Sequence, residues 1–182
     1  MTVTCQAAKP RYERTLNQQG EDSRMKLFVI RHGQARRANA KTDDSVRELT
    51  DTGKSHSRSV AETLANEDLR PALILCSNAV RARQTCEQFC ASINYKGALT
   101  YCPELYRATA AGYYRVISYY GGHADPLAII GHNPSAEEFV GNLCARHVSL
   151  STASVAVISC DCSRWDELVP GQGHLEDVID QH

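Results

Sequence analysis

Five short apolar runs along the chain predict the strands of a β-sheet. They lie at 26–31, 72–77, 99–102, 127–131 and 154–160. Three of them are almost continuous in valine, isoleucine and leucine, which is typical of strands covered on both faces. We expect a further strand near 165–169 at one edge of the sheet, followed by a polar C-terminal tail.

Between these runs, apolar residues recur at helical spacing. The segments 49–68, 80–94, about 110–120 and 134–146 each place apolar side chains on one stripe. Thr50 or Asp51 is a candidate N-cap for the first helix, and Pro134 suits the first turn of the fourth. Strands alternating with helices predict an α/β fold, namely a three-layer sandwich in which helices flank a mostly parallel central sheet.

Composition limits the class of protein. The chain has 182 residues, 42% of them hydrophobic, and a net charge of -1, which gives no indication of nucleic-acid or membrane binding. The polar, aperiodic residues 1–24 predict a disordered tail, and 25–182 a single domain. Eight cysteines occur without the paired spacing of a structural zinc site. We expect a monomeric cytoplasmic protein without a metal or other cofactor.

Polar residues gather where four of the predicted strands end. Arg31 and His32 end the first strand, Arg81 follows the second, Glu104 the third and His132 the fourth. The carboxyl ends of parallel strands share one edge of the sheet, where open α/β folds bind their ligands. These four junctions therefore predict one site that contains two histidines, two arginines and an acid.

These side chains suit phosphoryl chemistry. Two guanidiniums and the N-termini of helices favour a dianion, and a neutral imidazole is a nucleophile near physiological pH. A histidine that attacks phosphorus among Arg31, Arg81 and His132 would form a covalent phosphohistidine, which water then hydrolyses. The sequence shows no phosphate-binding loop of the Gly-x-x-x-x-Gly-Lys type and no cluster of metal-binding carboxylates.

Four motifs together resemble the histidine phosphatase superfamily, whose fold is that of phosphoglycerate mutase. They are "RHG" at 31–33, "LTDTG" at 49–53, "SNAVRARQT" at 77–85 and "GHNP" at 131–134. The short chain, "DDSVRELT" at 43–50 and "PELYRATAAG" at 103–112 are most similar to SixA-type phosphohistidine phosphatases. The resemblance implies a metal-independent phosphatase with a phosphorylated substrate, and a histidine-phosphorylated protein is the first candidate.

The resemblance also implies a role for each residue. His32 matches the nucleophile, Arg31 and Arg81 the phosphate-binding arginines, and His132 the second histidine of the pocket. Arg47 matches a further arginine on the substrate side. The general acid stays open between Glu104 and Asp44, because Glu104 matches the acid of the mutase-like branch only approximately in its spacing.

Two other functions stay open. One is a small phosphomonoesterase of the same superfamily that acts on a metabolite. The other is a binding module for a phosphorylated ligand that has lost turnover.

Overall fold

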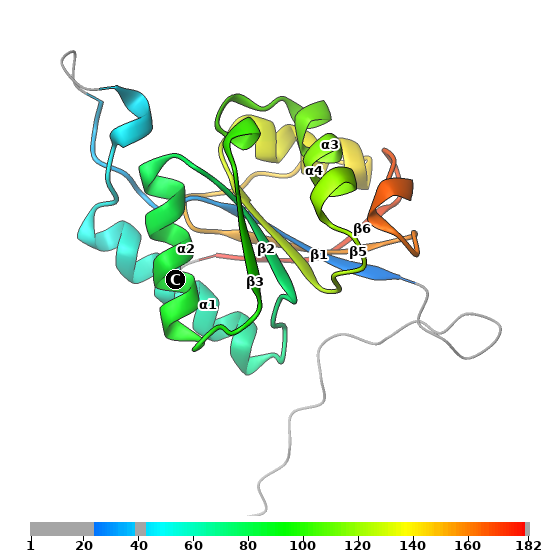
Figure 1. The fold of residues 1–182 in the computed structure, drawn as a ribbon, viewed down its shortest axis with the longest axis horizontal. Helices are drawn as coiled ribbons and strands as arrows, with labels where there is room; N and C mark the ends of the chain where they lie inside the picture. Colours follow the sequence, from blue (N-terminus) through cyan, green and yellow to red (C-terminus); the bar gives the residue numbers. More distant parts are fainter. Residues whose placement is uncertain (1–23, 39–42, 181–182) are drawn as a thin grey trace, which may run out of the picture.

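The computed structural model describes residues 24–38 and 43–180, which form an α/β sandwich (Figure 1). The six strands pair in the order β3-β2-β4-β1-β5-β6. Their bounds are β1 Met25–Arg31, β2 Leu73–Ser77, β3 Ala98–Cys102, β4 Leu127–Gly131, β5 Val155–Cys160 and β6 Gly173–Ile179. The strands β1 to β4 are mutually parallel, while β5 is antiparallel to both of its neighbours. The predicted mostly parallel sheet is confirmed.

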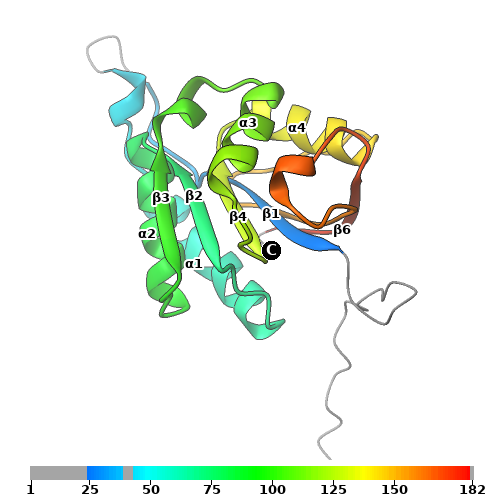
Figure 2. The ribbon, with the colours of Figure 1, turned by 45° about the vertical axis from the view of Figure 1, so that its right-hand side comes forward.

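Four helices cover the two faces of this sheet (Figures 1 and 2). Their bounds are α1 Asp51–Asn66, α2 Val80–Ser92, α3 Ala110–Tyr120 and α4 Ser135–Cys144. The side chains of β1 alternate between the layers. Leu27 and Val29 pack on the α3 and α4 side, and Phe28 and Ile30 on the α1 and α2 side. All four of these side chains are at most 1% exposed, so the central strand is fixed from both faces.

Three short 3-10 helices lie in the connections. They are η1 Asp44–Val46, η2 Pro103–Arg107 and η3 Trp165–Glu167. The segment that contains η1 folds back along the chain, because Arg36 N donates to Glu48 O at 2.8 Å and Thr50 N to Gln34 O at 2.9 Å. This return brings η1 close to the carboxyl ends of the parallel strands.

The prediction for the C-terminal part is wrong in two respects. The segment near Trp165 is not a strand but η3, and the indole Nε1 of this fully buried tryptophan donates to Ala124 O at 2.6 Å. The edge strand is β6, which lies where a polar tail was expected. Its alternating burial and its backbone pairing with β5 explain the polar composition.

Other expectations are not tested. The predicted disordered tail, 1–24, lies outside the described residues except for Arg24. In the described part of the chain, every helix is too short or too polar to cross a membrane.

Candidate active site

The nucleophile candidate, His32, follows β1 directly, and its ring is oriented by two contacts. Its Nδ1 lies 2.8 Å from the carbonyl oxygen of Gly33, and its Nε2 lies 3.1 Å from Nε of Arg81. A carbonyl only accepts and a guanidinium only donates, so Nδ1 carries the proton and Nε2 keeps its lone pair. Burial, together with the charges of Arg81 and Arg31, lowers the pKa of His32 from 6.5 to about 4, although the Gly33 contact opposes this. The ring is therefore neutral at pH 7.

Gly33 allows the end of β1 to pack against α1. A Cβ on Gly33 would lie 2.7 Å from the carbonyl oxygen of Gly53 and 2.8 Å from Ser57 Oγ. The Gly33 amide donates to Thr85 Oγ1 at 2.9 Å, and this hydroxyl donates to Arg81 O at 2.7 Å. The motifs at 31–33, 49–53 and 77–85 are thus held together at the point that orients the His32 ring.

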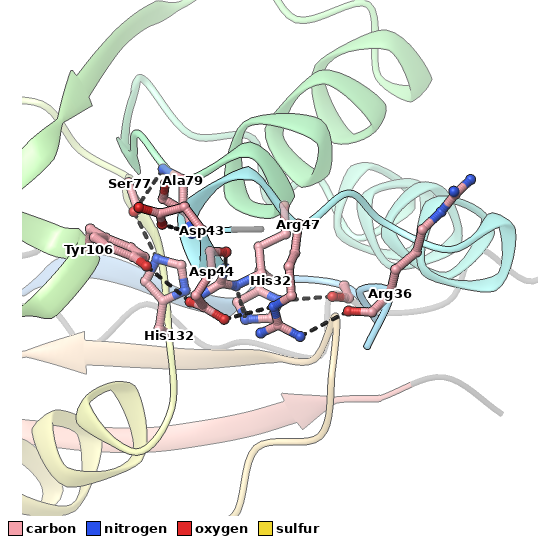
Figure 3. Close-up of polar contacts among 12 residues, drawn as sticks. His32, Arg36, Asp43, Asp44, Arg47, Ser77, Ala79, Tyr106 and His132 are labelled. Carbon is pink, nitrogen blue, oxygen red and sulfur yellow. Dashed lines mark hydrogen bonds and ion pairs between the residues drawn. The ribbon is translucent and has the colours of Figure 1, made fainter. Parts of the chain in front are cut away.

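Arg81 is 5% exposed and joins His32 to η1. Its Nη1 donates to the carbonyl oxygen of Asp44 at 2.7 Å and its Nη2 to Asp44 Oδ2 at 3.0 Å. Asp44 also accepts from Arg47 Nε at 2.7 Å and from the Tyr106 hydroxyl at 3.0 Å (Figure 3). Burial raises the pKa of Asp44, but Tyr106, Arg81 and Arg47 together outweigh it, so the net pKa is lowered. Asp44 is ionised at neutral pH.

His132 follows β4 and faces His32, with 5.0 Å between the ring centroids. Its Nε2 lies 2.7 Å from Ser77 Oγ, at the end of β2, and its backbone N–H donates to the buried Tyr113 hydroxyl at 3.0 Å. Burial, followed by repulsion from a protonated His32 and from Arg81, lowers the pKa of His132 from 6.5 to about 3. Gly131 leaves room for the Tyr113 hydroxyl, because a Cβ there would overlap it.

Arg31, the last residue of β1, adds a further charge that acts on His32. Its Nη1 donates to Leu150 O at 2.6 Å. Arg31 Nε and His132 Nδ1 are both buried and have no hydrogen-bond partner among the described residues. The cluster therefore holds two neutral imidazoles, His32 and His132, one carboxylate, Asp44, and three guanidiniums, Arg31, Arg47 and Arg81, whose charges all act on His32. This arrangement suits a doubly negative phosphoryl group.

The structure brings together five of the six residues predicted for the site, and it does not bring in Glu104. The Glu104 side chain is exposed on η2, and its Oε1 accepts a hydrogen bond from Tyr120 of α3 at 3.4 Å. Asp44, the alternative acid, lies within the cluster instead. In a 3-10 helix, with three residues per turn, Glu104 and Tyr106 point to different sides.

Two contributors were not identified from the sequence. Ser77 ends β2 at the same edge of the sheet as the predicted residues, so its position was a usable signal. The sequence gave no reason to single out Tyr106, because it is one of several tyrosines in this part of the chain, with others at 101, 113, 114, 119 and 120.

Comparison with known proteins identifies the family. The family model of the histidine phosphatase superfamily (branch 1) matches residues 27–105. The phosphohistidine phosphatase SixA of Escherichia coli is 31% identical over 145 residues, which cover 75% of this chain and 86% of that protein. This chain belongs to the histidine phosphatase superfamily.

Within that superfamily the chain is of the SixA type and is a phosphatase. The structure of a protein histidine phosphatase SixA complexed with tungstate superposes with a TM-score of 0.70 at 28% identity, covering 86% of this chain and 97% of that one. An uncharacterised chloroplastic protein of Arabidopsis thaliana is 26% identical over 167 residues, or 85% of this chain and 77% of its own length. The fold expected from the resemblance is confirmed.

Proposed function

We propose that the protein removes phosphoryl groups from phosphorylated histidine in proteins through a covalent intermediate on His32. The observation that carries this proposal is the orientation of His32. Its Nδ1 proton is held by the carbonyl of Gly33, so the lone pair of Nε2 points toward Arg81. A lowered pKa of about 4 keeps this lone pair available at neutral pH.

The reaction has two steps. Nε2 of His32 attacks phosphorus and forms a P–N bond, while the bond to the substrate nitrogen breaks and its electron pair leaves with that nitrogen. A proton on the other ring nitrogen of the substrate lets this imidazole leave as a neutral ring. Water then attacks the phosphorus on His32, the electron pair of the P–N bond returns to Nε2, and the protons of the water leave with the inorganic phosphate. Each step transfers the same phosphoryl group, so the protein mainly has to position it and neutralise its charge.

The positive charge that neutralises the phosphoryl group would come from Arg31, Arg47 and Arg81. His132 would add a hydrogen-bond donor. Ser77 Oγ lies 3.4 Å from Ala79 N, from which it accepts a hydrogen bond, so its own proton is free to be donated to Nε2 of His132. His132 would then carry its proton on Nδ1, which lacks a partner, and would donate it to a phosphoryl oxygen. Tungstate in the SixA structure is likewise a tetrahedral oxyanion, which supports an oxyanion site here.

The state of Asp44 supports a P–N rather than a P–O substrate. An alkoxide leaving group needs a proton, and general acid catalysis contributes roughly 10²–10⁴-fold. Asp44 is ionised and so has no proton to donate to a leaving group, and the Glu104 side chain contacts Tyr120 outside this cluster. The imidazole of phosphohistidine is a better leaving group and tolerates this arrangement. The E. coli relative is a phosphohistidine phosphatase by name, which points to the same substrate class.

We also propose that turnover needs no metal ion, because three guanidiniums supply the positive charge that a metal would otherwise provide. Activity should then persist in EDTA at its initial rate. Loss of activity in EDTA that Mg²⁺ or Zn²⁺ restores would contradict this part of the proposal.

A comparison of matched peptides tests the substrate class. One peptide sequence is prepared with phosphohistidine, made with phosphoramidate, and with phosphoserine or phosphotyrosine at the same position. We expect kcat/KM for phosphohistidine to exceed that for either ester by at least ~10²-fold, the contribution of the missing acid. A His32→Asn variant should be inactive on all three peptides. Equal values, or faster hydrolysis of an ester, would favour a phosphomonoesterase instead.

A further inference from the structure

A hollow lies over η2 and α3, beside the catalytic cluster. It has a volume of about 800 Å³, and its lining includes Glu104, Arg107, Gly112, Arg115, Tyr119 and Tyr120. We call this feature the α3 groove. None of these residues belongs to the cluster around His32.

Small residues explain why the helix surface is hollowed. Gly112, Arg115 and Tyr119 recur at helical spacing on α3 and so share one face, and Ala108 precedes the helix, at the end of η2. Gly112 has no side chain, and a Cβ there would lie only 3.0 Å from the Cβ of Ala108. Ala108 thus packs closely against the buried Gly112, and the lack of longer side chains at these two positions keeps this part of the lining low.

The groove carries positive charge for which the described residues provide no ion-pair partner, although Arg107 also attracts the carboxylate of Asp43, the residue before η1. Arg107 and Arg115 are exposed, and within residues 24–38 and 43–180 neither forms an ion pair with a carboxylate. The lining of the groove contains a single carboxylate, Glu104, whose Oε1 accepts a hydrogen bond from the Tyr120 hydroxyl. Two guanidiniums against one carboxylate favour an acidic ligand.

The groove also presents an aromatic surface. Tyr119 is 81% exposed and packs edge-on against Tyr120, with 4.7 Å between the ring centroids. Tyrosine and arginine are enriched where proteins bind one another, because each offers a broad contact surface together with a polar end. This combination fits an acidic segment that also carries an apolar side chain.

The α3 groove adjoins the catalytic cluster, and this position indicates which kind of molecule binds in it. The guanidinium of Arg107 lies over the Tyr106 ring, 5.6 Å from its centroid, and the Tyr106 hydroxyl donates to Asp44. One aromatic ring thus separates the groove from the cluster. A macromolecule whose phosphorylated side chain enters the cluster would lie across η2 and reach the groove, whereas a small phosphorylated metabolite would not.

We propose that the α3 groove docks an acidic segment, carrying an apolar or aromatic side chain, of the protein whose phosphohistidine enters the catalytic cluster. This inference rests on the proposed function and names how its substrate is recognised. The groove contributes affinity and association rate, while the chemistry on His32 is independent of it. Its loss should raise KM for a protein-like substrate and leave kcat unchanged.

Two phosphohistidine peptides test the proposal. One carries arms of about ten residues, rich in Asp and Glu and containing one Phe, on both sides of the phosphohistidine, and the other carries Gly/Ser arms. Arms of this length extend up to ~33 Å, which suffices to cross η2. With the wild-type protein at low salt, we expect KM for the acidic peptide to be about 3- to 10-fold lower, corresponding to one or two exposed ion pairs.

The Arg115→Glu variant should abolish this advantage without changing kcat on either peptide, and Tyr119→Ala should reduce it. Arg146→Glu is the matched control, because Arg146 is an exposed arginine after α4 that lines a different hollow. It introduces the same change of charge and should retain the wild-type advantage. Equal effects of Arg115→Glu and Arg146→Glu, or no difference between the two peptides, would overturn the proposal.

Direct binding separates this inference from the proposed function. The unphosphorylated acidic peptide, labelled for fluorescence anisotropy, should bind wild type and Arg146→Glu alike and bind Arg115→Glu more weakly. If wild type binds this peptide but hydrolyses neither phosphopeptide, the proposed function fails while the groove remains supported. If both phosphopeptides are hydrolysed but binding does not depend on Arg115, the groove proposal fails alone.

Discussion

Protonation of His132 should destabilise the folded protein as the pH falls. The residue is 6% exposed, and burial, followed by repulsion from a protonated His32 and from Arg81, lowers the pKa of His132 from 6.5 to about 3. The unfolded chain therefore takes up this proton at a higher pH than the folded protein does. Because the folded pKa lies below the unfolded one, this share of the free energy of unfolding is intact above pH 6.5 and is lost as the pH falls toward 3.

The size of the effect follows from the two pKa values. At about pH 5, protonation favours the unfolded state by RT ln(1 + 10^1.5), or about 2 kcal/mol, while His132 stays neutral in the folded protein. At about pH 3 the loss is about 4 kcal/mol, and it approaches its limit of about 5 kcal/mol below that pH, at 1.36 kcal/mol for each pKa unit. Other titrating groups add to the pH dependence of the whole protein, so the contribution of His132 has to be isolated by substitution.

The variant His132→Gln removes the titration and keeps an amide that can contact Ser77. Urea unfolding at about pH 7.5 and about pH 5 gives the free energy of unfolding of both proteins at both values. We expect the wild type to lose about 2 kcal/mol more than the variant between these values. Any direct structural cost of the substitution is present at both and cancels in the difference. The same loss in both proteins would refute a buried, neutral His132.

Three further predictions concern the neighbours of the two histidines. Gly33→Ala should destabilise the protein by ~1–3 kcal/mol and reduce kcat by up to ~10²-fold, because its Cβ would meet the carbonyl oxygen of Gly53 at 2.7 Å and displace His32. A variant with the stability and kcat of the wild type would contradict this. Tyr113→Phe should cost ~1–3 kcal/mol in urea unfolding by leaving the buried amide of His132 without its acceptor, and a neutral result would show that the hydroxyl does not hold this backbone. Asp44→Asn should lower the inhibition constant of inorganic phosphate about fivefold, because it removes the carboxylate beside the arginines, whereas Glu104→Gln should change this constant by less than about twofold. A larger effect of Glu104→Gln than of Asp44→Asn would place Glu104 in the site.

The strands and the edge that carries the site were predictable because they follow from burial. A strand covered on both faces must be apolar throughout, so a change to Arg31 and His32 marks its end. Parallel strands end at one edge, and this placed Arg81 and His132 near His32 without any knowledge of side-chain contacts.

The position of the acids was not predictable in the same way. Asp44 reaches the cluster only because the chain from Gln34 to Thr50 folds back on itself through backbone hydrogen bonds. Glu104 lies outside the cluster because of its orientation in η2. This helix has only five residues, which are too few for a periodic pattern in the sequence to indicate where each side chain points. The strand β6 was missed because its half-exposed residues are polar, and its place in the sheet depends on backbone pairing with β5.

The most direct test of the proposed mechanism is to trap the phosphorylated enzyme. The protein is mixed with a labelled phosphohistidine peptide, quenched in alkali, where phosphohistidine survives, and mapped by mass spectrometry. We predict acid-labile phosphate on His32, formed in a burst that precedes steady release of phosphate, and no label on the His32→Asn variant. Label on any other residue, or full turnover by His32→Asn, would contradict the central role of His32.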